Sequence, residues 1–145
     1  MKRMIFSRCI ILVLASIVSV SYAGMQKIVI TKDNLADLKG NWVGSRTVGP
    51  GPKLNTDLDI SNDNLPVEGK FIFYDVQRQD KTGSTVTGST VVVDFKGRIN
   101  DQGNLLIIGA NMEVELSLYE DGGKKKIEGT FFMRGARGTM SFKKK

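Results

Sequence analysis

The sequence has no histidine and a single cysteine, Cys9, among its 145 residues. Without histidine, and with no cysteine beyond residue 9, Ser-His-Asp and Cys-His nucleophilic sites and the usual His/Cys zinc sites are excluded. Proline is scarce, and Trp42 is the only tryptophan. We therefore predict no catalytic residue, no metal site and no cofactor. The fold is expected to depend on an apolar core and its hydrogen bonds instead of disulfides.

The first 23 residues have the pattern of a secretory signal peptide. Lys2, Arg3 and Arg8 form a basic start, which leads into an apolar run over 10–20. That run is too short for a comfortable membrane span, and no later segment approaches one. Small residues then end at Ala23, as in a signal-peptidase site. We expect cleavage near Ala23, a secreted or periplasmic location and no membrane span, with an uncleaved anchor as the alternative.

Removal of that segment leaves about 120 residues, a length that suits one domain over 24–145. Cys9 leaves with the segment, so the remaining chain could form no disulfide. Three of the 21 basic residues also leave, and 18 then stand against 15 acidic residues, a net charge of +3 instead of +6. So mild an excess does not indicate nucleic-acid binding, and no nucleic-acid partner is predicted.

Apolar and polar residues alternate along most of the remaining chain. In the clearest run, Met112 to Leu118, Met, Val, Leu and Leu alternate with Glu, Glu and Ser. This alternation is typical of half-buried strands, and clusters of turn residues such as Asp121–Gly123 separate the runs. The pattern predicts eight strands, at about 41–48, 54–62, 69–78, 86–98, 104–109, 112–120, 126–134 and 137–143.

Short connections without helical crossovers imply antiparallel neighbours. Eight such strands, each with one apolar face, close most naturally into an up-and-down barrel, and a two-sheet β-sandwich is the alternative. Only the segment 31–39 has a helical pattern, with Thr31 or Asp33 as its cap and Gly40 at its end. We therefore predict an all-β fold, an eight-stranded antiparallel barrel preceded by a short helix.

The segment LKGNWVG, at residues 38–44, carries a Gly-x-Trp pattern directly after the expected helix. It resembles the opening of lipocalins and avidin-like barrels, the calycin group, and the segment 127–144 is similar to their closing hairpin. The resemblance implies a barrel in which Trp42 packs at the closed end. In lipocalins an arginine of the last strand commonly covers this tryptophan, and here a lysine among 143–145 would take its place. A single tryptophan departs from the biotin binders of the group.

In an up-and-down barrel, alternate connections lie at the same end. Trp42 belongs to one end, and the opposite, open end collects six cationic residues: Arg46, Lys53, Arg78, Lys81, Arg134 and Arg137. Low-dielectric walls would focus positive potential at this mouth, and arginine suits carboxylates and phosphates. We predict a non-enzymatic protein that binds a small amphiphilic or anionic ligand there. Its ligand-binding residues would be Arg46, Arg78, Arg134, Arg137, Phe73, Phe95 and Phe131.

Other interpretations remain open. Solvated arginines at the loops would bind nothing, and the largely apolar inward positions could fill the barrel. Apolar residues on the outer face, among them Ile72 and Phe132, would then favour an interaction or inhibitor module with a protein partner or a homodimer. An enzyme based on carboxylates or tyrosines of the barrel ranks third, because carboxylate pairs such as Glu113 and Glu115 alternate with apolar residues and are predicted to face solvent.

Overall fold

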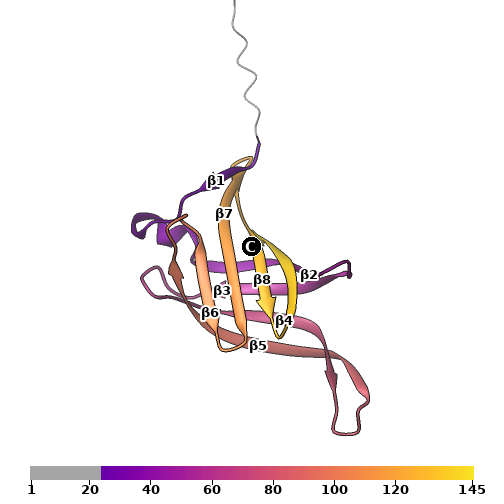
Figure 1. Ribbon diagram of the computed structural model, residues 1–145. Helices are drawn as coiled ribbons and strands as arrows, with labels where there is room; N and C mark the ends of the chain where they lie inside the picture. The colour runs from indigo at the N-terminus through magenta and orange to yellow at the C-terminus, as the bar shows by residue number, and fades with distance from the viewer. Residues whose placement is uncertain (1–23) are drawn as a thin grey trace, which may run out of the picture.

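The computed structural model describes residues 24–145, apart from the side chains of residues 78, 79, 86 and 87. The signal peptide predicted over 1–23 lies outside the described residues. Figure 1 shows a fold made almost wholly of strands. They are β1 (Gln26–Ile28), β2 (Gly40–Val48), β3 (Lys53–Ile60), β4 (Val67–Gln79), β5 (Thr85–Ile99), β6 (Leu105–Gly109), β7 (Met112–Asp121), β8 (Lys124–Met133) and β9 (Ala136–Lys144).

Strands β2 to β9 form a closed antiparallel barrel of eight strands. Each pairs with the next along the chain, and β9 pairs back with β2. The predicted barrel is therefore present, and the sandwich alternative is not. In Figure 1, β2 to β5 run across the view while β6 to β9 run up and down. Strand β1 adds to the edge of β7 beyond the reach of the short β6, with Lys27 opposite Tyr119.

In place of the helix expected over 31–39, the chain has a 3-10 helix, η1 (Lys32–Asp37). Asn34 fixes its start, because Oδ1 accepts a hydrogen bond from the Thr31 N–H at 2.8 Å and Nδ2 donates to the Val29 carbonyl at 2.9 Å. Leu35 and Leu38 are buried and attach the helix to the core. No helix in the described part of the chain is long and apolar enough to cross a membrane.

The barrel interior is filled by side chains from every strand of the wall. Three phenylalanines each lie directly across from a glycine of the neighbouring strand. A Cβ atom on that glycine would come within 3 Å of the ring in each case, so the ring occupies the room that the missing side chain would need. Such pairs let strands coil closely in a barrel without leaving a void. The pairs are Gly44 with Phe142, Gly69 with Phe95, and Gly138 with Phe131.

Candidate functional site

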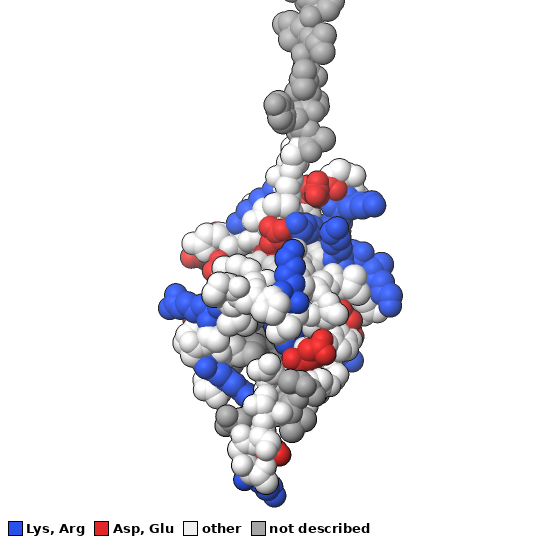
Figure 2. Space-filling model, turned by 90° about the vertical axis from the view of Figure 1, so that its right-hand side faces the viewer, with Lys and Arg blue, Asp and Glu red and all other residues white. Residues whose placement is uncertain are grey.

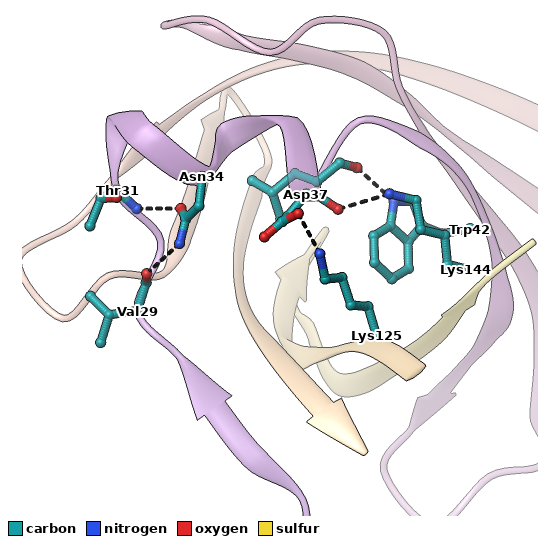
Figure 3. A network of polar contacts seen from close by, with 8 residues as sticks. Val29, Thr31, Asn34, Asp37, Trp42, Lys125 and Lys144 are labelled. Atoms are coloured by element: carbon teal, nitrogen blue, oxygen red, sulfur yellow. Dashed lines mark hydrogen bonds and ion pairs between the residues drawn. The ribbon is translucent and has the colours of Figure 1, made fainter. Parts of the chain in front are cut away.

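The closed end of the barrel is built around Trp42, whose side chain is fully buried (Figure 3). Its Nε1 donates to the carbonyl of Leu38 at 2.7 Å. The Nζ of Lys144, on the last strand, donates to the carbonyl of Asp37 at 3.0 Å and lies 5.2 Å from the indole centroid. Trp42 therefore packs at the closed end as the resemblance implied, and a lysine covers its ring.

Charges at this end are balanced within the fold. The Asp37 carboxylate forms an ion pair with Lys125 of β8, which joins η1 to the barrel wall. The pKa of Lys144 is lowered, chiefly because the ammonium is partly desolvated and also because Lys125 repels it, while Asp37 acts in the opposite direction. Side chains also satisfy the carbonyls at the end of η1: Trp42 of β2 bonds to that of Leu38, and Lys144 of β9 bonds to that of Asp37.

Arg46 does not lie on the open rim, where the sequence analysis placed it. Its side chain points into the barrel and is only 8% exposed, because Trp42, Gly44 and Arg46 alternate along β2 and share the inward face. The guanidinium lies 5.2 Å from the centroid of the Phe73 ring. Burial lowers the pKa of Arg46, and the negative charge of Asp75 opposes that shift.

The hydrogen bonds of Arg46 all go to the wall of the barrel. Its Nη1 donates to the carbonyl of Asn55 at 2.9 Å and to Oγ1 of Thr56 at 2.8 Å, and its Nη2 donates to the carbonyl of Tyr74 at 2.9 Å. Thr56 and Phe73 are the last paired residues of β3 and β4, so Asn55 and Tyr74 lie just where these strands separate. We call this point the fork.

Beyond the fork, β4 leaves the barrel wall. Asp75 has a φ of 54°, in the left-handed region, and the pairing of β4 with β5 is irregular there. On the outer face, the Tyr74 hydroxyl donates to Asp57 Oδ2 at 3.1 Å, which raises the pKa of Tyr74. Strands β4 and β5 then continue together, from Val76 to Ser89, as a hairpin that we call the arm, seen at the lower right of Figure 1.

The three phenylalanines predicted to contact a ligand are core residues. Phe73 is 4% exposed, and Phe95 and Phe131 are each 6% exposed. The first two stand on either side of Phe71, with centroid distances of 5.6 Å and 5.0 Å. The structure therefore brings Arg46 and Phe73 together, but in a packed interior.

Two of the remaining predicted arginines lie at the hairpin that joins β8 and β9. Arg134 lies exposed in the turn between β8 and β9, with a φ of 49°. Arg137 is exposed on the outer face, where its Cζ lies 5.5 Å from the centroid of the Phe132 ring. Arg78 belongs to the arm, and its side chain is outside the described part. On the face seen in Figure 2, several basic side chains gather at the upper right, and others lie separately at the left and at the bottom.

The structure does contain a groove on the outer face of β7, β8 and β9, which we call the outer groove. It has a volume of about 490 Å³. Strand register sets its floor, because Glu115, Thr130 and Thr139 form one cross-strand row. The next row is Ser117, Glu128 and Ser141. Asn104 and Tyr119 complete its polar and aromatic lining.

Glu115 is held rigidly at one edge of the outer groove. Its Oε1 accepts hydrogen bonds from Nδ2 of Asn104 at 2.6 Å and from Nδ2 of Asn100 at 3.0 Å. These two bonds, that of Asn104 first, lower the pKa of Glu115 and keep it ionised. Ser117 Oγ donates in turn to Asn104 Oδ1 at 2.9 Å. The sequence placed Glu115 on the outer face but gave no sign of its asparagine partners, which come from a turn.

Two further grooves, of about 540 and 190 Å³, lie on the outer face of β2 to β5. All three grooves therefore open on the outside of the barrel wall. Within residues 24–145, no group of three or more His, Cys, Asp or Glu side chains is close enough to hold a metal ion.

One strand of the wall is incompletely paired. β5 has 15 residues, but only Gly97, Arg98 and Ile99 pair with β6. Over residues 85–96, the side of β5 that faces away from β4 has no ladder partner in the described chain. We call this side the free edge. Val92 lies on it with 55% of its surface exposed.

Comparison with known proteins finds no match: no family model, no curated protein and no solved structure matches this chain.

Proposed function

We propose that this chain is a non-enzymatic binding protein that takes a neutral saccharide in the outer groove. As part of the proposal it is secreted or periplasmic after cleavage near Ala23, and its barrel is related to the calycin group. The closed eight-stranded barrel and the packing of Lys144 on Trp42 support that relationship. The preorganised Glu115 carboxylate carries the assignment of the site.

The lining of the outer groove matches the chemistry of a sugar. Serine and threonine hydroxyls both donate and accept, the amide of Asn104 donates, and ionised carboxylates accept strongly. With Oε1 of Glu115 occupied by two amides, Oε2 remains to accept from a sugar hydroxyl. The ring of Tyr119 offers an apolar surface at the same groove.

The charges around the outer groove favour a neutral ligand. Glu128 forms an ion pair with Lys126, and Lys27 lies opposite Tyr119 and lowers the pKa of Glu115 by its positive charge. Each carboxylate in the groove therefore has a cation near it. A strongly charged ligand of either sign would meet a like charge in this groove.

Saturation-transfer NMR tests this proposal with cellotriose, maltotriose and chitotriose at millimolar concentration. We expect signal transfer to at least one of these trisaccharides. Substitution of Glu115 by Gln keeps an acceptor for Asn100 and Asn104 but removes the charge, and it should weaken that transfer several-fold. Glu120→Gln, an exposed residue on the same strand, is the matched control. No transfer from any of the three, or equal transfer in E115Q, would contradict the assignment.

The amphiphilic or anionic ligand predicted for the open end is tested separately. Native mass spectrometry of the purified protein, followed by organic extraction, should show an apo mass, because side chains fill the interior and Arg46 already makes three hydrogen bonds to the wall. A lipid or carboxylate released by extraction would instead restore the prediction of a carrier. Alanine at Arg134 and Arg137 should then abolish its binding.

A protein-interaction module is the second candidate function, and the free edge of β5 favours it. Unpaired strand edges readily accept another strand.

A further inference from the structure

We propose that this chain forms a homodimer in which the free edge of β5 pairs antiparallel with the free edge of a second copy, about a two-fold axis at Val92. The outer groove lies on the opposite half of the barrel wall, so this inference does not rest on the saccharide site. It assigns a partner to the incompletely paired strand.

The free edge has the properties of a strand that is to be paired. Alternate residues of β5 direct their N–H and C=O groups away from β4, and the described chain offers no ladder partner for them. Between Ser89 and Lys96 the edge carries no proline. The register shift opposite Ser89 and Val91 places its extra residue in β4, so β5 itself is not bulged there. The next shift places its extra residue in β5 between Val86 and Ser89, so the regular part of the free edge begins at Ser89. Natural proteins often protect an exposed edge with prolines or bulges.

Self-pairing is restricted to a few registers. A two-fold axis perpendicular to the sheet keeps inward side chains opposite inward ones, so the axis must pass through a residue and not between two. The end of the free edge at Gly97, where β6 begins to pair, limits how far the second copy can slide. The possible centres are therefore residues near the middle of the segment 89–95.

The sequence favours Val92 as that centre. Val92 then packs on Val92 of the second copy, and Val91 lies opposite Val93, so β-branched residues pair on both faces. Asp94 meets the hydroxyl-bearing Thr90, so no like charges oppose each other over the regular segment 89–95. A shift of the axis to Val93 would place Val92 against Asp94, and a shift to Asp94 would place two carboxylates in contact.

The result would be one continuous sheet across both molecules, in which β2 to β5 of one barrel join β5 to β2 of the other. The arms would lie on either side of the axis. Val92, with 55% of its surface exposed in one copy, would become covered.

Sedimentation velocity of the purified chain across micromolar to hundred-micromolar concentrations measures the dimer directly. We expect a concentration-dependent dimer, and we expect Val92→Lys to raise its dissociation constant at least tenfold. Ile108→Lys is the matched control, because Ile108 is 61% exposed on a neighbouring strand and lies off the free edge. Circular dichroism verifies that both variants are folded. A monomer at every concentration, or a dimer unaffected by V92K, would overturn the proposal.

Cysteine trapping tests the register. In a Cys9→Ser background, Val92→Cys should form an intermolecular disulfide on addition of oxidised glutathione, whereas Ile108→Cys should not. Thr90→Cys alone should stay reduced, but mixed with Asp94→Cys it should give a crosslinked heterodimer. Equal crosslinking of V92C and I108C would contradict the two-fold axis at Val92. Because no saccharide is present, failure here leaves the result for the outer groove unaffected.

Discussion

At the closed end and at the fork, side chains of barrel strands donate hydrogen bonds to backbone carbonyls, but the chain then follows a different course in each place. At the closed end, Trp42 and Lys144 donate to the last carbonyls of η1. At the fork, Arg46 donates to the carbonyls of Asn55 and Tyr74, where the β3–β4 ladder stops. In both places a side chain of a barrel strand satisfies backbone groups that lack a regular partner. The closed end is thereby completed, whereas the fork allows two strands to leave the wall.

The two regions differ in the support that the next segment of the chain receives. Beyond η1 the chain enters β2 and stays in the barrel. Beyond the fork, β4 and β5 support only each other, and a two-stranded ribbon is marginal by itself in water. The barrel is therefore a stable base for a weakly stabilised arm.

Removal of the indole at the closed end should have the largest effect. Trp42→Ala should lower the free energy of unfolding by about 3–5 kcal/mol, because a fully buried large side chain and its hydrogen bond are lost. Urea titration followed by circular dichroism measures this. Val43→Ala, an exposed neighbour on the same strand, should change it by less than about 0.5 kcal/mol. A loss below about 1 kcal/mol in W42A would show that the closed end is not anchored as described.

Loss of the guanidinium at the fork should come second. Arg46→Met keeps an apolar stem beside Phe73 but leaves two carbonyls unsatisfied, at a cost of about 1.5–3 kcal/mol. Hydrogen exchange should also accelerate at the amides of Val76 and Gln77, where the arm begins. Arg137→Met, an exposed arginine that also lies on an aromatic ring, should be nearly neutral. If both variants behave alike, Arg46 does not hold the fork.

The lysine on the tryptophan should matter less than the tryptophan itself. Lys144→Met should cost about 0.5–1 kcal/mol, through loss of the cation–π contact and of the bond to Asp37. Lys143→Met serves as the control, because Lys143 is exposed and lies opposite Val43 on the outer face. Urea midpoints of the two variants decide this prediction. If K144M and K143M have equal urea midpoints, Lys144 does not stabilise the closed end, and the prediction is wrong.

The smallest expected effect is on how the free energy of unfolding changes at acidic pH. The pKa of folded Glu115 lies below its ordinary value of 4.5, so its contribution is present above pH 4.5 and is lost as the pH falls through the folded pKa. Glu115→Gln should therefore lose less stability than the wild type as the solution is acidified through this window. Chemical unfolding at several pH values measures the slope, and Glu120→Gln should follow the wild type. The hydrogen bonds of Arg46 at the fork should not respond in this way, because none of their acceptors is a carboxylate.

Much of the barrel could be predicted because its signal is local. Alternation and turn residues mark each of the eight strands to within a few residues, and Trp42 marks the closed end. β1 was missed, because three residues are too few to show a period. The inward position of Arg46 was available in the sequence, since it lies four residues after Trp42 on an alternating strand. The nearness of Arg46 to the turn after β2 predicted a position on the rim, but alternation along the strand decides where its side chain points.

The outer groove and the free edge depend on register and could not be predicted. Asn104 reaches Glu115 because it directly precedes Leu105, which the strand register places opposite Leu116 on β7. The free edge exists because only three residues of β6 pair with β5, while β6 continues to Gly109 alongside β7. Neither feature can be predicted from the alternation of apolar and polar residues along a single strand.

The pairing of phenylalanine with glycine across the wall has a consequence for the evolution of this fold. Because each glycine lacks a side chain that could swing into the space, shortening Phe131 or Phe95 would leave a void that its partner cannot refill. A single substitution would thus turn this filled barrel into one with an internal cavity. A cavity suited to small apolar guests could arise before any residue adapted to hold them.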